Sequence, residues 1–258
     1  MCIRDSLQTP LESIAANSRH ITLMESDEIE LLKFREKNIF GGHDDHDDHG
    51  DEHDEHADEH GDEHDEHDEH ADEHGDEHDD HHDGHAHGEH DIHFWLDPEI
   101  AKTIVKIVTR ELSEIDPSNA STYESNSTKA INEIDQLISD TKSKINSNAS
   151  YVVFHDAYQY FEKRFGVEVV GALTVNPEVL PGAKQLSEIR EVIEHENINC
   201  LFSEPQFNPS IAETIAQDTG VKAAVIDPLG AELNPGKDLY FDLIGNIASS
   251  FELSLIHI

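Results

Sequence analysis

Residues 151–173 read YVVFHDAYQYFEKRFGVEVVGAL, and this stretch decides the fold class of the chain. Two short apolar runs flank a segment with helical spacing, and the same alternation continues to residue 251. Strands that alternate with helices are typical of an α/β fold, in which helices cover a parallel sheet. We predict strands over 151–155, 167–173, 200–203 and 223–226, and helices over 157–165, 183–196, 210–218 and 239–251.

Three polar residues stand where predicted strands end. His155 closes the first strand, Glu204 follows the third and Asp227 follows the fourth. Ligands of open parallel sheets bind beyond the carboxyl ends of the strands, so we expect these side chains at one edge. His93, which opens the apolar segment HFWL, is a fourth candidate. Imidazoles and carboxylates bind zinc or manganese, so these residues predict a metal site.

Each of these residues also has a plainer interpretation, which the pattern leaves open. A His at a strand end is often a hydrogen-bonded loop residue. Asp227 precedes Pro228 and would also suit the start of a turn. Glu204 is either a salt-bridge partner or a group that orients a metal ligand from behind. His93 could instead simply be the last of the many His residues that precede it in residues 43–90.

A helix start lies just after His93. Residues 93–96 (HFWL) suit an extended, half-buried segment. Asp97 is a good N-cap and Pro98 a good first helical residue. Apolar residues at helical spacing then predict a helix that stops near Asp116, and a second, largely exposed helix follows over about 118–146. Farther upstream, residues 20–24 (HITLM) suit a strand.

The stretch from Gly42 to Asp91, here called the His-acidic segment, contains 16 His and 25 Asp or Glu, and no Lys or Arg. Such a composition buries no core, so we expect the segment to be disordered without a ligand. A solvating acidic linker would need only Asp and Glu, so the many imidazoles favour weak, interchangeable metal sites. The candidate ligands in it are His43, His46, His49, His81, His82, His85, His87 and His90.

The composition excludes several classes of function. The formal net charge is -40, which argues against nucleic acid and anionic membranes as partners and favours cations. No apolar run approaches the roughly 20 residues needed to span a bilayer. Cys2 and Cys200 form no zinc-ribbon spacing, and no catalytic motif such as GxSxG or HExxH is present. We therefore predict a binding protein rather than an enzyme.

Several of these stretches also carry a family resemblance. IHFWLDPEIA, YVVFHDAYQYFEKRFG, TVNPEVLPGAKQLSEIRE, LFSEPQFNPSIAETIA and VIDPLGAEL occur in this order. Together they resemble the zinc-binding component of bacterial high-affinity zinc ABC importers, over essentially residues 7–251. The resemblance implies two Rossmann-like α/β lobes with parallel sheets, joined by one long helix, with zinc held in the cleft between them. It also implies a periplasmic or lipid-anchored location and delivery of the ion to a membrane permease.

The resemblance divides the chain into five parts. It implies a remnant of an N-terminal lobe that is largely missing (1–41), the His-acidic loop (42–91), the end of the N-terminal lobe (92–116), a linking helix (117–149) and a C-terminal α/β lobe (150–252). In the family a first ligand His lies upstream of the residues present here. The signal sequence is also missing, and Cys200 lacks the second Cys that relatives often have.

The resemblance also assigns ligands. His residues matching His93 and His155 bind the metal, whereas manganese-binding relatives have Glu in place of His155. An Asp matching Asp227 is a ligand in some relatives, and in the zinc branch water or another carboxylate takes its place. We thus expect a monomer that captures Zn²⁺ and passes it to an ABC permease, with the His-acidic segment as an auxiliary collector or sensor.

Three other functions remain as alternatives. In one, the protein is a soluble zinc buffer or chaperone that acts through the His-acidic segment alone. In another, it is a manganese- or iron-binding member of the same family. The third is a metal-dependent hydrolase, which would need an open coordination position and a positioned base, and no convincing base is present.

Overall fold

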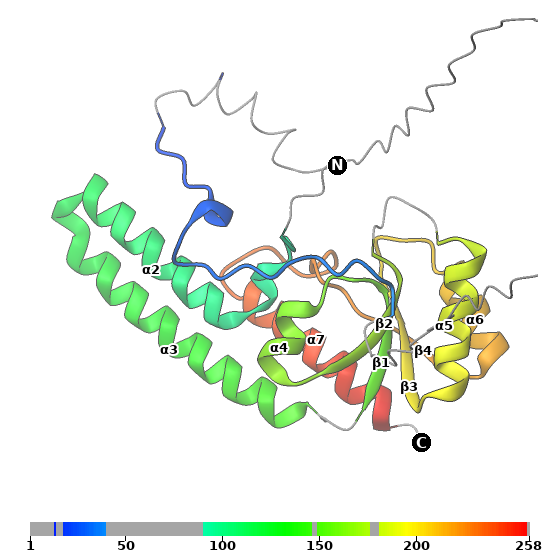
Figure 1. The fold of residues 1–258 in the computed structure, drawn as a ribbon. Coiled ribbons are helices and arrows are strands. Elements are labelled where there is room, and N and C mark those ends of the chain that lie inside the picture. Colours follow the sequence, from blue (N-terminus) through cyan, green and yellow to red (C-terminus); the bar gives the residue numbers. More distant parts are fainter. Residues whose placement is uncertain (1–12, 14–17, 40–89, 146–148, 176–180, 257–258) are drawn as a thin grey trace, which may run out of the picture. The chain divides into compact units, whose positions relative to one another are not determined.

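The computed structural model describes residues 13, 18–39, 90–145, 149–175 and 181–256 (Figure 1). All of the described residues belong to one compact unit. The His-acidic segment therefore lies outside the described residues, except for His90 and Asp91. Within the described ranges no helix has the length and apolarity needed to cross a membrane.

A four-stranded parallel sheet is the centre of the fold. The strands lie in the order β2-β1-β3-β4, so the first and third strands along the chain are the inner ones. All four predicted strands are confirmed to within two residues. Their bounds are Ser150–His155 (β1), Glu168–Thr174 (β2), Ile198–Ser203 (β3) and Lys222–Val225 (β4).

Helices cover both faces of this sheet, as Figure 1 shows. Alternate residues of β1 point to opposite faces, because successive side chains of a strand do so. Val152 packs in a cluster with apolar residues of α5 and α6, and Val153 packs in a second cluster with residues of α3, α4 and α7. These elements span Ala120–Lys144 (α3), Gln159–Phe165 (α4), Ala183–His195 (α5), Ser210–Thr219 (α6) and Leu239–Ile256 (α7).

Two long helices precede the sheet. Helix α2 spans Pro98–Ile115, and a 3-10 turn, η3 (Pro117–Asn119), leads from it into α3. The predicted start is confirmed, since the Asp97 side chain accepts a hydrogen bond of 2.8 Å from the Glu99 N–H. The apolar face of α2 is only partly covered within the described part of the chain. Its residues Val108, Leu112 and Ile115 are 42%, 39% and 62% exposed.

Two local predictions are wrong. Residues 20–24, predicted as a strand, contain the start of a 3-10 turn (η1, Leu23–Glu25), and no partner strand runs beside them in the described ranges. A strand needs such a partner to satisfy its backbone groups. Residues 94–96, predicted as extended, form another 3-10 turn (η2, Phe94–Leu96). Leu96 is fully buried in the core, and the Trp95 indole N–H donates to the Pro228 carbonyl at 3.0 Å.

An extended segment, residues 31–39, runs past α4 to the edge of the sheet, in blue in Figure 1. Its Lys33 forms an antiparallel bridge with His90, and Ile39 forms one with Gly171 of β2. The Asn38 carbonyl also accepts a hydrogen bond of 2.8 Å from the Ala172 N–H. Ile39 and His90 are therefore both held in the folded unit by backbone bridges, and His90 lies three residues before His93.

Candidate metal centre

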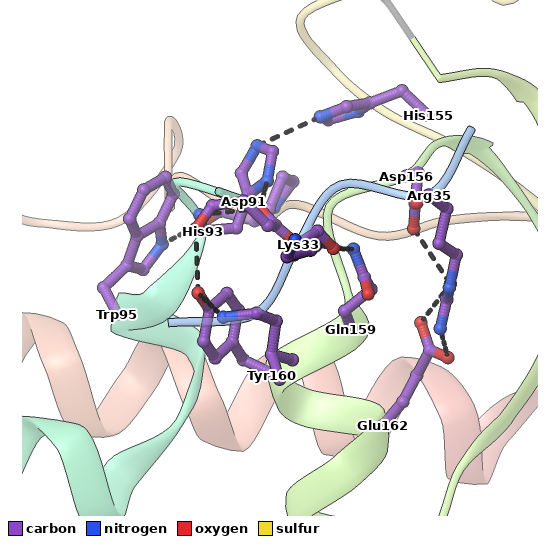
Figure 2. Close-up of polar contacts among 12 residues, drawn as sticks. Lys33, Arg35, Asp91, His93, Trp95, His155, Asp156, Gln159, Tyr160 and Glu162 are labelled. Carbon is purple, nitrogen blue, oxygen red and sulfur yellow. Dashed lines mark hydrogen bonds and ion pairs between the residues drawn. The ribbon is translucent and has the colours of Figure 1, made fainter. Parts of the chain in front are cut away.

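Two imidazoles face each other at the carboxyl edge of the sheet (Figure 2). His155 is the last residue of β1, and His93 immediately precedes η2. Their Nε2 atoms lie 3.5 Å apart. Two nitrogens bound to one tetrahedral zinc ion, each at 2.0–2.1 Å, would be about 3.3–3.4 Å apart. The pair is thus already spaced to share one ion.

A buried carboxylate holds the other nitrogen of each ring. Asp91 Oδ1 lies 2.6 Å from His93 Nδ1, and Glu204 Oε1 lies 2.7 Å from His155 Nδ1. Both carboxylate side chains are fully buried. An ionised carboxylate only accepts hydrogen bonds, so each Nδ1 carries the hydrogen and each Nε2 presents a lone pair. This arrangement, a carboxylate behind each imidazole, is common behind metal-binding His residues.

Asp91 is a site residue that the sequence pattern does not reveal, because it looks like the last acidic residue of the His-acidic segment. Its Oδ1 also accepts from the His93 N–H at 2.9 Å, and its Oδ2 accepts from Gln159 Nε2 at 3.0 Å. Its backbone is held too, through its N–H to the Leu32 carbonyl and its carbonyl to the Tyr160 hydroxyl. The Asp-Ile-His spacing next to an apolar run was the available signal.

Glu204 lies where a group that orients His155 should lie. It follows β3, the neighbour of β1, so the two strand ends meet. Its second oxygen, Oε2, and the Tyr158 hydroxyl are both buried without a hydrogen bond. Burial, followed by the proximity of the Glu204 carboxylate, raises the pKa of Tyr158 well above its usual value. Tyr158 therefore stays a neutral phenol beside the carboxylate.

Asp227 is engaged by its own loop. Its carboxylate accepts hydrogen bonds from Gln206 Nε2 (2.6 Å) and from the backbone N–H groups of Leu229 (3.0 Å) and Ala231 (2.6 Å). Partial burial alone would raise the pKa of Asp227, but these hydrogen bonds lower it below the usual value. Among the described residues no group of three or more His, Cys, Asp or Glu could hold an ion, so Asp227 does not join the two imidazoles. Its role as a ligand stays a prediction.

The remaining predicted ligands belong to the His-acidic segment. His90 is half-buried and lies in the bridge to Lys33. The others, His43, His46, His49, His81, His82, His85 and His87, lie outside the described residues.

Two further buried carboxylates, Asp156 and Glu162, share one arginine next to His155. Arg35 binds Asp156 at 2.9 Å and Glu162 at 2.6 Å, so one cation faces two buried carboxylates (Figure 2). Burial raises the pKa of Asp156 to about 6 and that of Glu162 to about 7, against the opposing effect of Arg35. Burial therefore favours the neutral form of both carboxyls, whereas the charge of Arg35 favours the ionised form.

Comparison with curated proteins finds zinc-uptake relatives. The chain is 42% identical over 167 residues to the high-affinity zinc uptake system protein ZnuA of Brucella abortus. This match covers 64% of the present chain and 50% of the relative. The match to the protein of the same name from Yersinia pestis is 37% identical over 172 residues, with 66% of this chain and 54% of the relative covered. The chain thus spans about half the length of the curated relatives it matches.

A solved structure with the same fold belongs to a protein described as metal-transporting. The laminin-binding protein Lmb of Streptococcus agalactiae, described as having adhesin and metal-transporting activity, is 30% identical with a TM-score of 0.57. The match covers 64% of this chain and 65% of that one. This match confirms the predicted α/β fold class with a parallel sheet covered by helices.

A family comparison covers nearly the whole chain. Residues 5–252 match the sequence profile of ZnuA, described as zinc-uptake complex component A, periplasmic. That description names a transport component, as predicted, and not an enzyme. The resemblance found in the sequence motifs is therefore confirmed, and the chain belongs to the family of periplasmic zinc-uptake complex component A proteins.

Proposed function

We propose that this chain captures Zn²⁺ between His93 and His155 and delivers it to an ABC permease for zinc uptake. One observation carries the proposal, namely the 3.5 Å separation of the two Nε2 atoms, each on a ring oriented by a buried carboxylate. The family and the names of its relatives support the same cargo.

Zinc fits this pair better than manganese does. Imidazole nitrogen suits zinc, whereas manganese prefers carboxylate, carbonyl and water oxygens. Two imidazoles fill two of the four positions of a tetrahedral ion. Water fills a further position, or Asp227 does so after its carboxylate leaves the N–H groups of its own loop. Zinc needs the neutral imidazole, so we expect capture to weaken below about pH 6.

The transport role is proposed from the family. The family is described as periplasmic, and we propose the same location and a monomeric state for this protein. The His-acidic segment acts in this proposal as an auxiliary collector. Its second end is anchored at His90, three residues before His93, so tethering raises the concentration of zinc near the site.

A zinc titration with a competing chelator tests the proposal. Trp95 is the only Trp of the chain, and its ring centroid lies 5.3 Å from that of His93, so its fluorescence reports on this site rather than on the His-acidic segment. The wild-type chain should show one tight site. His155→Ala should weaken it by at least about 100-fold, and the exposed His195→Ala should leave it unchanged.

The zinc-buffer alternative makes a different prediction. If the His-acidic segment is the whole function, removal of residues 42–87 abolishes tight binding and His155→Ala changes nothing. In our proposal the deletion keeps the tight site, because His90, Asp91 and His93 are retained. Loss of all tight binding in the deletion variant would overturn the proposed function.

A further inference from the structure

We infer that Gln159 is a positioning residue of the metal centre, which acts on His93 through Asp91. The inference rests on the proposed function and deepens it. Gln159 is the first residue of α4, four residues after His155, and it is buried. Its side chain points toward the segment that carries Asp91 and His93 (Figure 2).

The contacts of Gln159 require an amide. Its Nε2 donates to Asp91 Oδ2 at 3.0 Å and to the Lys33 carbonyl at 3.3 Å. Both partners are acceptors, so a group with two N–H donors must face them. A Glu at this position would place acceptors against acceptors, and an apolar residue would leave both partners without this donor. The geometry therefore distinguishes Gln from residues of similar size.

The consequence for His93 follows from the two oxygens of Asp91. Oδ1 holds His93 twice, through the backbone N–H and through Nδ1. Gln159 fixes the other oxygen, which sets the plane of the carboxylate and thereby the direction of the His93 ring. Without Gln159, Asp91 Oδ2 loses a hydrogen bond in a fully buried place, and the carboxylate gains rotational freedom.

Gln159 also links the two imidazoles mechanically. Helix α4 starts shortly after His155, and the same helix holds Asp91 through Gln159 and Asp97 through Arg164. The turn that carries His93 is thus attached at both ends to the helix that follows His155. Of these two attachments only Gln159 contacts the carboxylate that orients the His93 ring. Substitution of Gln159 should therefore weaken zinc binding even where the free energy of unfolding changes little.

The test is a double-mutant cycle on the full chain, with zinc affinity measured by Trp95 fluorescence against a competing chelator. Asp91→Asn should weaken binding by about 10- to 100-fold, as for other partners of metal-bound His. Gln159→Met should weaken it by about 10-fold, because it acts one residue farther from the metal. In the Asp91→Asn background Gln159→Met should add little, because the two residues act in series.

Two further variants separate positioning from folding. Tyr151→Phe removes the hydroxyl that donates to the Phe251 carbonyl in the core, away from the metal centre, so it should lower the thermal midpoint and leave zinc affinity within about threefold. Gln159→Asn keeps the amide but shortens the side chain, and it should weaken zinc binding as Gln159→Met does, even if the Met variant folds poorly.

The possible outcomes are distinct. Wild-type affinity in both Gln159 variants would overturn the inference, as would an equal loss from Gln159→Met in the wild-type and Asp91→Asn backgrounds. A wild-type chain without any tight site that responds to His155→Ala would instead overturn the proposed function on which the inference depends.

Discussion

The Nε2 atoms of His93 and His155 lie 3.5 Å apart although the two residues are 62 positions apart in the sequence. The separation is bridged by α2 and α3, which lead the chain away from the sheet edge and back to β1. A carboxylate orients each ring: Asp91, two residues before His93, and Glu204, the residue after β3.

The first prediction concerns Glu204. Glu204→Gln keeps the shape and an acceptor oxygen but removes the negative charge behind His155. A neutral acceptor makes the imidazole a weaker ligand, so zinc affinity should fall by about 10-fold or more. The same fluorescence titration measures this, and the exposed Glu194→Gln is the control. Unchanged affinity in Glu204→Gln would show that the carboxylate has no part in metal binding.

The second prediction concerns the ion pair between Arg164 and Asp97. Arg164 Nε and Nη2 donate to the two Asp97 oxygens at 2.7 and 2.8 Å, and Asp97 is buried. Arg164→Met leaves this carboxylate without its cation, so the free energy of unfolding should fall by about 1–3 kcal/mol. Urea denaturation measures the change.

A matched control exists on α3. Lys129 pairs with Glu133 at 3.8 Å, and both side chains are largely exposed. Such pairs contribute at most about 0.5 kcal/mol, so Lys129→Met should change stability little. Equal losses in Arg164→Met and Lys129→Met would contradict the role given to the buried pair.

The third prediction concerns pH and Glu162. Burial raises the pKa of Glu162 from 4.5 to about 7 in the folded protein. A folded-state pKa above the unfolded value means that folding favours the protonated form. The stabilising contribution is complete below about pH 4.5 and is lost as the pH rises through about 7. A shift of this size corresponds to on the order of 3 kcal/mol in unfolding free energy.

Glu162→Gln provides the measurement. The variant cannot titrate here, so the difference in unfolding free energy between wild type and variant should change between pH 4.5 and 8 in metal-free protein. Comparison of the two proteins cancels the titration of the many other carboxylates. A difference that stays constant over this range would mean that Glu162 ionises normally in the fold.

The fourth prediction concerns two glycines. A Cβ at Gly171 would lie 2.9 Å from the Asn38 carbonyl oxygen and 3.1 Å from Ile189 Cδ1, so Gly171→Ala should destabilise the protein by about 1–3 kcal/mol. A Cβ at Gly245, inside α7, meets nothing within 4 Å. Gly245→Ala should therefore stabilise the protein by about 0.5–1 kcal/mol, because Ala favours the helix. Thermal unfolding of both variants tests the contrast, and a stabilising Gly171→Ala would show that residues 38–39 do not pack on β2.

The secondary structure of the described residues was largely predictable, because it depends on local patterns. The apolar runs of β1 to β4 are buried strands, and Asp97 followed by Pro98 starts α2 as expected. The turn at 94–96 was not predictable, since an apolar segment of three residues suits a strand and a 3-10 turn equally. Contacts with the distant Pro228 carbonyl decide between them.

The sequence by itself determined which residues were candidates at the metal centre, because His93 and His155 stand out at the ends of recognisable elements. Only the tertiary structure decided which carboxylates accompany them. Asp91 looks like one more acidic residue of the His-acidic segment, yet it is buried against Gln159 and orients His93. Asp227 stands directly after a predicted strand, where a ligand is expected, yet the N–H groups of its own loop bind it. The physical reason is that a carboxylate takes the hydrogen-bond donors that folding brings closest, and these come from distant segments for Asp91 and from neighbouring residues for Asp227.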